Sequence, residues 1–209
     1  MATTKSLSQF KTKLAGGGAR TNLFEVSIPA FPPAVREFWG NGPGREGETF
    51  NFLCTAAQLP ASTIAEINVP FRGRNLKVAG DRSIATWTVN ILNDENFQLR
   101  TAFEIWMNAI SKLDDATGVS NPSSYMTDAY VQQFGRGATQ ASTSNRGRES
   151  AVLRTYKFID IFPTEVAAIS LDYATSDLER FDVTFQVQHF TVGESAQSNT
   201  SEAGQVLIQ

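Results

Sequence analysis

The sequence predicts a mainly β protein of the α+β class, in which an antiparallel sheet packs against one α-helix. Three observations predict it: alternating apolar and polar residues in several segments, one segment with apolar residues at helical spacing, and a high Phe content. The 209 residues include 15 Phe, 3 Trp and 4 Tyr, most of them in alternating runs, where aromatic residues favour strands. A chain of this length can bury one core, so we expect one domain.

The stretch from Val78 to Leu113 contains the clearest change of period. A Gly-Asp pair at 80–81 predicts a turn, and Trp87, Val89 and Ile91 then alternate with polar residues, as in a half-buried strand. Asn93 or Asp94 can cap a following helix. Apolar residues next recur three and four apart, at Leu99, Phe103, Trp106, Met107, Ile110 and Leu113. This stripe predicts a helix packed on the sheet.

Alternation predicts further strands before and after this stretch. They are expected at 22–28, 49–57, 125–134, 152–162 (ended by Pro163), 165–172 and 179–190. The last is the most regular, with Phe181, Val183, Phe185 and Val187 predicted inward and Asp182, Thr184, Gln186 and Gln188 outward. An antiparallel sheet with a polar outer face follows.

The remaining segments lack a clear period. Residues 1–20 carry Lys5, Lys11, Lys13 and Arg20 without an acid and include three consecutive glycines, which predicts a flexible basic arm. Pro and Gly at 29–48 predict a surface insertion that exposes Phe38 and Trp39 to a partner. Residues 58–82 are predicted to form a long extended segment that leaves the body of the domain. Residues 135–150 are predicted to form a low-complexity loop, and 193–209 a polar tail.

Composition argues against several classes of function. The formal charge is −3 and the pI about 5.3, so nothing drives the chain as a whole towards nucleic acid. A single cysteine, Cys54, and a single histidine, His189, allow no thiolate cluster, internal disulfide or multi-histidine site. We therefore expect no metal, no cofactor and no enzymatic activity. No apolar run reaches the roughly twenty residues of a membrane helix, which predicts a soluble protein made in a cytoplasm.

Five short motifs carry a resemblance to a known family. They are LPAS at 59–62, VAGDR at 78–82, WTV at 87–89, NDE at 93–95 and FPTEV at 162–166. In this order, and with the segments between them from Asn22 to Thr191, the chain resembles the tail-tube proteins of contractile-tailed bacteriophages, which are related in fold to secretion-system tube proteins. The resemblance implies a β-sandwich or half-barrel with a flanking helix. It also implies that six copies join their sheets into a ring-shaped barrel, and that stacked rings form the virion's inner tail tube, the conduit for phage DNA.

The resemblance gives roles to residues and names partners. A tail-tube domain is expected at 21–192, between the arm and the tail. Ring-stacking or inter-subunit candidates are Leu59, Pro60, Ile67, Phe71, Arg72, Arg74, Lys77 and Arg82; lumen candidates are Asp182, Thr184, Gln186 and Gln188; outer-surface candidates facing the sheath are Phe38 and Trp39. Expected partners are further copies of the chain, the tail sheath protein, a baseplate tube-initiator, and tape-measure and tail-terminator proteins. Phage DNA is expected to pass through the lumen without sequence-specific binding. No membrane binding is expected.

Three alternative functions remain open from the sequence. A baseplate tube-initiator or a secretion-system tube protein would share the fold, and the copy number in the assembled particle would distinguish them. A monomeric carbohydrate-binding β-sandwich would use an exposed Trp39 and loop tyrosines to bind a glycan. An enzyme is the third alternative, although no base lies near a nucleophile in any recognisable pattern.

Overall fold

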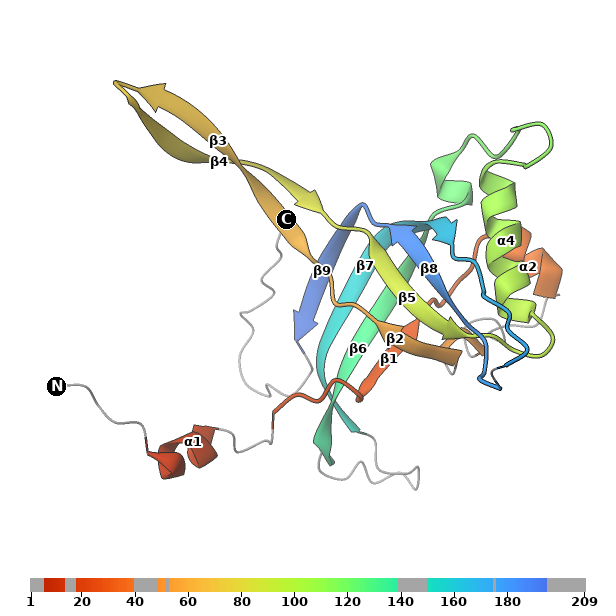
Figure 1. Cartoon of the computed structure of the whole chain (residues 1–209), viewed down its shortest axis with the longest axis horizontal. Helices are drawn as coiled ribbons and strands as arrows, with labels where there is room; N and C mark the ends of the chain where they lie inside the picture. The colour runs from red at the N-terminus through yellow and green to blue at the C-terminus, as the bar shows by residue number, and fades with distance from the viewer. Residues whose placement is uncertain are drawn as a thin grey trace.

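The protein folds into one curled antiparallel sheet, with helices α2 and α4 against one face and a long hairpin that projects from the body (Figure 1). The computed structural model describes residues 6–13, 18–39, 49–51, 53–138, 150–174 and 176–194. The mainly β class with a half-barrel sheet and few helices is therefore confirmed.

The main sheet has seven strands in the order β1-β6-β7-β8-β5-β2, with β9 also paired to β7. Their bounds are Phe24–Ser27 (β1), Cys54–Ala57 (β2), Trp87–Leu92 (β5), Thr127–Ala138 (β6), Ser150–Val166 (β7), Arg180–Gln186 (β8) and His189–Glu194 (β9). Every pairing is antiparallel, as the alternating segments predict. The hairpin strands β3, Ser62–Phe71, and β4, Arg74–Ile84, form a separate two-stranded sheet.

Strand β7 is the longest strand and connects the two halves of the sheet. Its first part pairs with β9 and its last part, from Phe162, pairs with β8. The segment 179–190, predicted as one strand, is thus divided into β8 and β9. The prediction that Pro163 ends the preceding strand is wrong, because β7 continues to Val166 through a register shift between Pro163 and Glu165. Such irregularities tolerate a proline that lacks the N–H of a regular ladder.

The core lies between the sheet and helix α4, Gln98–Ile110. The alternation predicted for β5 and β8 is confirmed, since Trp87, Val89 and Ile91 are buried beside Phe181, Val183 and Phe185. From α4, the buried residues are Leu99, Ala102, Phe103 and Trp106. The indole Nε1–H of Trp106 donates to the carbonyl oxygen of Tyr125 at 2.7 Å, which satisfies its polar atom in the core. The predicted helix on a sheet is therefore confirmed, although Leu113 lies beyond the helix and is 98% exposed.

Asp94 caps helix α4. Its Oδ2 accepts from the backbone N–H of Gln98 at 3.1 Å and its Oδ1 from that of Leu99 at 3.3 Å. These N–H groups belong to the first turn, which has no acceptor within the helix. Asn93, the other predicted cap, instead donates its side-chain amide to Glu179.

Replacing Asp94 with Ala is expected to lower the free energy of unfolding by about 1 kcal/mol, the usual cost of a lost cap. Urea denaturation followed by circular dichroism measures this change. Asp114→Ala is the matched control, because Asp114 lies outside the helices on an exposed loop and should leave the midpoint unchanged. Equal midpoints for all three proteins would exclude the capping role.

The insertion predicted at 29–48 is partly folded into the core. Helix α2, Pro33–Trp39, buries Val35, and Phe31 before it is also buried. The predicted exposure of Trp39 is wrong: its ring is half-buried and packs edge-on against Phe31, with centroids 5.7 Å apart. Phe38 is 45% exposed, as predicted. Residues 40–48 lie outside the described part.

Three other sequence predictions need correction. In the segment 49–57, only β2 is extended, while residues 49–51 and 53 are helical. No short strand occurs among the described residues after Val166, since 167–179 form the loop between β7 and β8. The N-terminal arm contains a helix, α1, Leu7–Lys13, which exposes Leu7 and Phe10. Residues 139–149 and 195–209, predicted as a loop and a tail, lie outside the described part.

Candidate functional site: assembly surfaces

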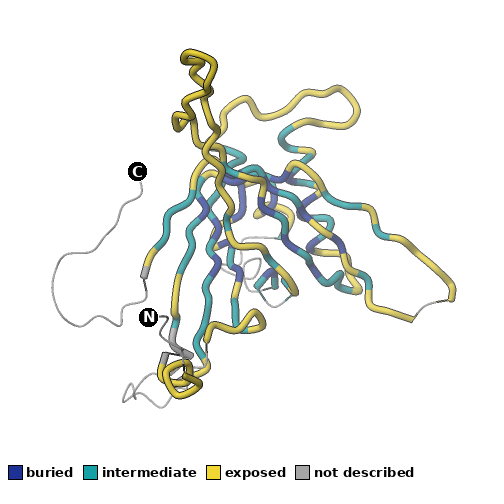
Figure 2. Tube along the Cα trace, turned by 60° about the vertical axis from the view of Figure 1, so that its left-hand side comes forward, coloured by how far each residue is buried: buried dark blue, intermediate teal, exposed yellow. Residues whose placement is uncertain are grey.

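The β3–β4 hairpin is exposed along most of its length, with only Gly80 and Ile84 half-buried, and it forms the yellow projection at the upper left of Figure 2. Its pairing places Ile67 opposite Val78, Val69 opposite Leu76 and Phe71 opposite Arg74. One side of this ribbon is therefore mainly apolar: it carries Ile67, Val69, Phe71, Leu76 and Val78, with Arg74 opposite Phe71 at its end. These five side chains, here called the apolar hairpin face, are between 44% and 66% exposed. A free apolar surface of this kind marks an interaction site.

The opposite side of the hairpin is polar. Lys77 Nζ lies 2.8 Å from Glu66 Oε2, so this predicted stacking residue is already paired inside its own hairpin. Asn68, which is paired with Lys77, and Asn75 also belong to this side. The hairpin is thus amphipathic, with one face suited to water and the other to a partner surface.

A two-residue turn joins the hairpin strands. Arg72 and Gly73 both have positive φ, 44° and 80°, which is the backbone of a type I′ turn that matches the twist of the strands. Glycine at the second position accepts this conformation without strain. The Cζ atom of Arg72 lies 5.5 Å from the centroid of the Phe71 ring. The turn therefore presents a paired aromatic ring and guanidinium at the far end of the hairpin.

The base of the hairpin bends at Gly80. The register shifts between Ile64 and Glu66 on β3, and Gly80 and Asp81 lie opposite Ala65 there. The predicted Gly-Asp turn is therefore a β-bulge instead, and bulges bend a strand. A Cβ on Gly80 would lie 3.0 Å from the carbonyl oxygen of Ala65 and 3.1 Å from Cγ1 of Ile67. The absence of a side chain lets the two strands approach each other at the bend.

The predicted ring-stacking residues come together only in part. Ile67, Phe71, Arg72, Arg74, Lys77 and Arg82 all lie on the hairpin, whereas Leu59 and Pro60 precede it. Val69, Leu76 and Val78 were not among the predicted residues, although the alternation in INVPF and LKV indicates them. Among the described residues, no ion pair involves Arg72, Arg74 or Arg82. These charges are available to a partner.

The second candidate surface is the polar face of the main sheet. Asp182, Thr184 and Gln186 lie on it, as predicted, and so do Thr88 and Asn90 from the paired strand β5. Hydrogen bonds cross the strands here: Thr55 Oγ1 lies 2.6 Å from Asn90 Oδ1, and Asn90 Nδ2 donates to Asp182 Oδ1 at 2.7 Å. Gln188 is exposed in the short break between β8 and β9. These residues form an ordered layer of uncharged and acidic side chains, and the exposed Arg180, two residues before Asp182, lies on the same face.

A lysine on the first half of the sheet is neutralised locally. Lys157 Nζ lies 2.8 Å from Asp128 Oδ2 and 5.7 Å from the centroid of the Tyr130 ring. The hydrogen bond that the Lys157 ammonium donates to Asp128 raises the pKa of Lys157, so the ammonium stays charged but paired. Its attraction for an outside anion is reduced accordingly.

The groups that could carry out chemistry are not assembled into a reactive site. Within the described residues, no group of three His, Cys, Asp or Glu side chains could bind a metal ion. His189 is exposed at the start of β9 and lies opposite Ile159. Burial raises the pKa of the Cys54 thiol to about 12, which disfavours the thiolate nucleophile. In the described part of the chain, no helix has both the length and the apolarity to cross a membrane.

Cys54 is expected to be inert to a thiol reagent such as Ellman's reagent at pH 8 in the folded protein. The thiolate carries the reactivity, and the raised pKa leaves it scarcely populated at this pH. Absorbance of the released thiolate should show rapid, stoichiometric reaction only after unfolding in urea. Reaction of the folded protein at the rate of a free thiol would contradict the buried placement.

Comparison with known proteins gives one consistent family. The family model described as phage tail tube protein matches residues 19–193. The tail tube protein gp19 of Enterobacteria phage T4 is 30% identical over 178 residues, which cover 84% of this chain and 93% of that protein. The tail tube protein of Serratia phage KSP90 is 22% identical over 174 residues, covering 82% and 88%.

Solved structures show the same fold at low sequence identity. A chain of the anti-feeding prophage baseplate, in a six-fold symmetrised structure, has a TM-score of 0.58 at 12% identity and covers 85% of this chain and 96% of that one. The sheath/tube terminator of the extracellular contractile injection system PVC has a TM-score of 0.53 at 14% identity, covering 84% and 96%. The chain therefore belongs to the phage tail tube protein family, and it is a structural component of the virion's tail rather than an enzyme.

Proposed function

We propose that copies of this chain form stacked hexameric rings that make the inner tube of a contractile tail, and that phage DNA passes through the lumen. One observation carries most weight: the β3–β4 hairpin exposes five large apolar side chains far from its own core. An isolated two-stranded hairpin is marginally stable in water. Covering the apolar hairpin face with another copy would contribute on the order of 5 kcal/mol to the free energy of association. Full burial of each such side chain contributes about 1.5–3 kcal/mol, and about half of each side chain is already buried in the single copy.

The edge strands of the sheet give a physical reason for several copies to close into a ring. The strand order begins with β1 and ends with β2, and β9 pairs with β7 alone among the described strands. Such edges offer unpaired N–H and C=O groups that can template aggregation. Joining the sheets of neighbouring copies would satisfy these groups, and a head-to-tail contact that closes gives a ring. The six-fold symmetrised baseplate of the anti-feeding prophage, which contains a chain of this fold, supports the number six.

The polar sheet face is the proposed lining of the lumen. The opposite face is covered by α4 and by the core residues beneath it, so the polar face is the one that can meet solvent inside a tube. Asp182, Thr184 and Gln186, with Gln188 beside them, carry no positive charge. Each cation that pairs with a phosphate strengthens DNA binding through counterion release. Of the cations on this face, Lys157 is paired with Asp128 and Arg180 lies at the start of β8. A lining dominated by amides, hydroxyls and carboxylates would let DNA slide with little adhesion.

The remaining partners follow from the same placement. Phe38 on α2, with the half-buried Trp39 beside it, lies on the helical side away from the polar face and is proposed to meet the sheath. The solved structures of this fold come from sheath/tube terminator, baseplate and cap assemblies. They support contacts at the tube ends with a tail terminator and a baseplate tube-initiator. A tape-measure protein and DNA are proposed to occupy the lumen.

Negative-stain electron microscopy and sedimentation of the purified protein test this function. Rings, or hollow tubes of constant diameter, are the expected result. A chain that sediments as a monomer and shows no particles at any concentration would contradict it. A glycan-binding monomer would be the alternative then, although Trp39 is packed on Phe31 rather than free.

A further inference from the structure

The loop between β7 and β8 combines exposed apolar and acidic side chains. Leu171, Tyr173 and Leu178 are each more than 70% exposed. Asp172, Asp177 and Glu179 alternate with them along the loop. Ser170, Leu171, Asp172, Tyr173, Asp177 and Glu179 line a hollow of about 340 Å³. The loop, 167–179 with all but residue 175 described, therefore offers a concave surface with both apolar and negative walls.

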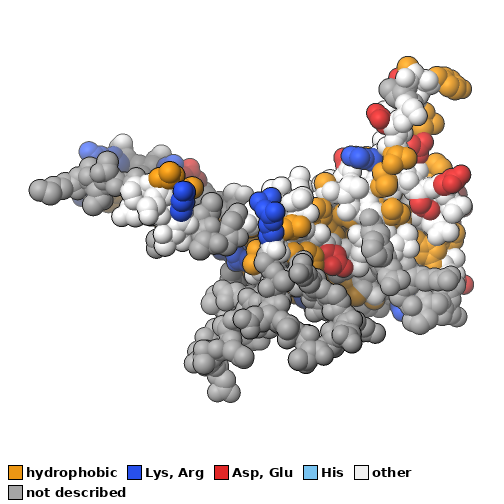
Figure 3. Space-filling model, turned by 90° about the horizontal axis from the view of Figure 1, so that it is seen from below, with side chains coloured by type: hydrophobic (Ala, Val, Ile, Leu, Met, Phe, Trp, Pro, Cys, Tyr) orange, Lys and Arg blue, Asp and Glu red, His pale blue; other side chains and the backbone are white. Residues whose placement is uncertain are grey.

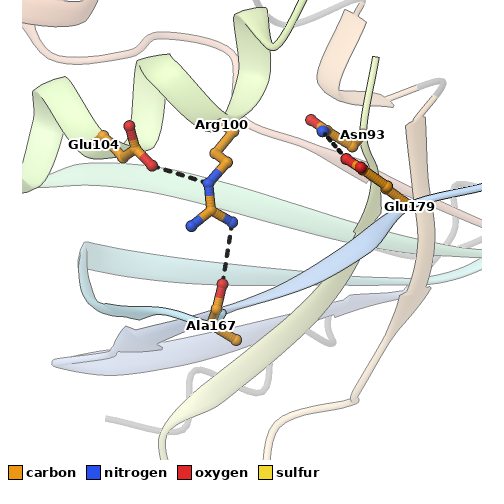
Figure 4. A network of polar contacts seen from close by, with 5 residues as sticks. All are labelled: Asn93, Arg100, Glu104, Ala167 and Glu179. Atoms are coloured by element: carbon orange, nitrogen blue, oxygen red, sulfur yellow. Dashed lines mark hydrogen bonds and ion pairs between the residues drawn. The ribbon is translucent and has the colours of Figure 1, made fainter. Parts of the chain in front are cut away.

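Both ends of this loop are held to the body (Figure 4). At its start, Arg100 Nη1 donates to the carbonyl oxygen of Ala167 at 3.1 Å, while Arg100 Nε is paired with Glu104 at 2.9 Å. At its end, the Asn93 side-chain amide donates to Glu179 Oε2 at 2.8 Å, and the Asn93 backbone N–H donates to the Glu179 carbonyl oxygen at 2.9 Å. A loop pinned at both ends loses less conformational freedom when a partner binds.

The hairpin tip has the complementary chemistry. Phe71 is 66% exposed, and Arg72 stacks on its ring. Arg74 lies opposite Phe71 across the turn. Neither arginine is ion-paired in the described part of the chain. An aromatic ring and a guanidinium that enter a pocket together are typical of interface hot spots.

The tip and the hollow cannot meet within one chain. Figure 1 shows the hairpin at the upper left and the β7–β8 loop at the lower right, and Figure 2 separates them again after rotation. In the view of Figure 3, most of the visible acidic side chains lie towards the right and Lys and Arg side chains towards the left. Two complementary surfaces at opposite sides of one chain form a head-to-tail contact, which repeats from copy to copy.

We propose that the hairpin tip of one copy, Phe71 to Arg74, inserts into the hollow of the β7–β8 loop of a second copy. Phe71 packs on Leu171 and Tyr173, and the two arginines face Asp172 and Asp177. This inference rests on the proposed tube and names the receiving surface of the stacking contact.

Cross-linking between engineered cysteines tests the contact. In the variant N75C/S170C, the cysteines lie beside the proposed contact and leave Phe71, both arginines and Tyr173 in place. A short bismaleimide should join assembled copies of this variant into a ladder of covalent multimers on a denaturing gel. Both positions are exposed, so folding should persist, as circular dichroism can verify. Native Cys54 is half-buried, and its raised pKa disfavours the reactive thiolate, so it should contribute little background. Each single variant should give no ladder.

The matched control is N75C/L113C, because Leu113 is also exposed but lies on a different loop, after α4. A ladder from N75C/S170C at least tenfold stronger than from this control is the expected result. Tubes that form normally, with no ladder or with equal ladders from both variants, would overturn the proposed contact while leaving the tube intact. A failure of the unmodified chain to form any particle would instead refute the proposed function, and this inference with it.

Discussion

Reversing the charges of Arg72 and Arg74 to Glu is expected to block tube growth while leaving the monomer folded. Both side chains lie at the exposed hairpin tip, so their loss costs the isolated fold little. In the assembly, a truncated hot spot costs about 2 kcal/mol or more, and reversal adds repulsion. A rise of at least 100-fold in the concentration needed for assembly follows, since each 1.4 kcal/mol is tenfold. Sedimentation and thermal melting measure the two effects.

A compensating change makes this test specific. Adding D172R and D177R to the reversed tip should restore assembly, because the charges across the proposed contact are then exchanged rather than lost. The control R36E/K112E reverses two exposed cations elsewhere and should assemble at the normal concentration. Normal growth of R72E/R74E would exclude the hairpin tip from the assembly contact.

The second large effect is expected from Trp106→Ala in the core. Trp106 is fully buried, and its ring centroid lies 5.8 Å from that of Phe31 and 6.0 Å from that of Phe185. Its indole N–H donates a hydrogen bond to the carbonyl oxygen of Tyr125. Removing the ring leaves a cavity and an unpaired carbonyl, at a cost of about 3–5 kcal/mol. Because a domain is stable by only about 5–15 kcal/mol, the variant should unfold at much lower urea concentration.

Urea denaturation of Trp106→Ala is best measured in the R72E/R74E background, where assembly does not add to the apparent stability. Leu113→Ala is the matched control, since Leu113 is 98% exposed and should leave the midpoint unchanged. A loss below 1 kcal/mol for Trp106→Ala would contradict its central place in the core.

The regular part of the fold is predictable from local sequence because its burial has a fixed period. The alternation of Trp87, Val89 and Ile91 matches the pleat of a strand, and the spacing of Leu99, Phe103 and Trp106 matches one helix face. Both patterns arise from burial against the same core. Leu113 continued the pattern by coincidence of spacing, although the helix had already ended at Ile110.

From the sequence, residues 58–82 are predicted to form an extended segment and not two paired strands. Their apolar face covers no core of the same chain, so the pattern does not indicate a strand of the main sheet. Pro70, Gly73 and Gly80 suggested an irregular excursion, yet the glycines form a turn and a bulge inside a regular ladder. A pattern search that ignores proline and glycine would find the alternation from Ile67 to Phe71. Such a search could not find the surface that receives the hairpin, since the proposed β7–β8 loop lies about a hundred residues further along the chain.

The insertion at 29–48 was predicted to lie on the surface, but part of it is buried in the core. Its prolines and glycines predicted a surface segment, but Phe31 and Val35 are buried and Trp39 packs on Phe31. A single turn or two of helix has too few residues to display a clear period. Its burial depends on α4 and is therefore a tertiary effect.

A cryo-electron microscopy reconstruction of the assembled protein tests the central claim most directly. We expect a hollow tube of stacked six-membered rings in which Asp182, Thr184 and Gln186 face the lumen. The β3–β4 hairpin of each copy should contact the next ring. A reconstruction in which the hairpin projects freely into solvent, or in which the polar sheet face lies on the outside, would contradict it.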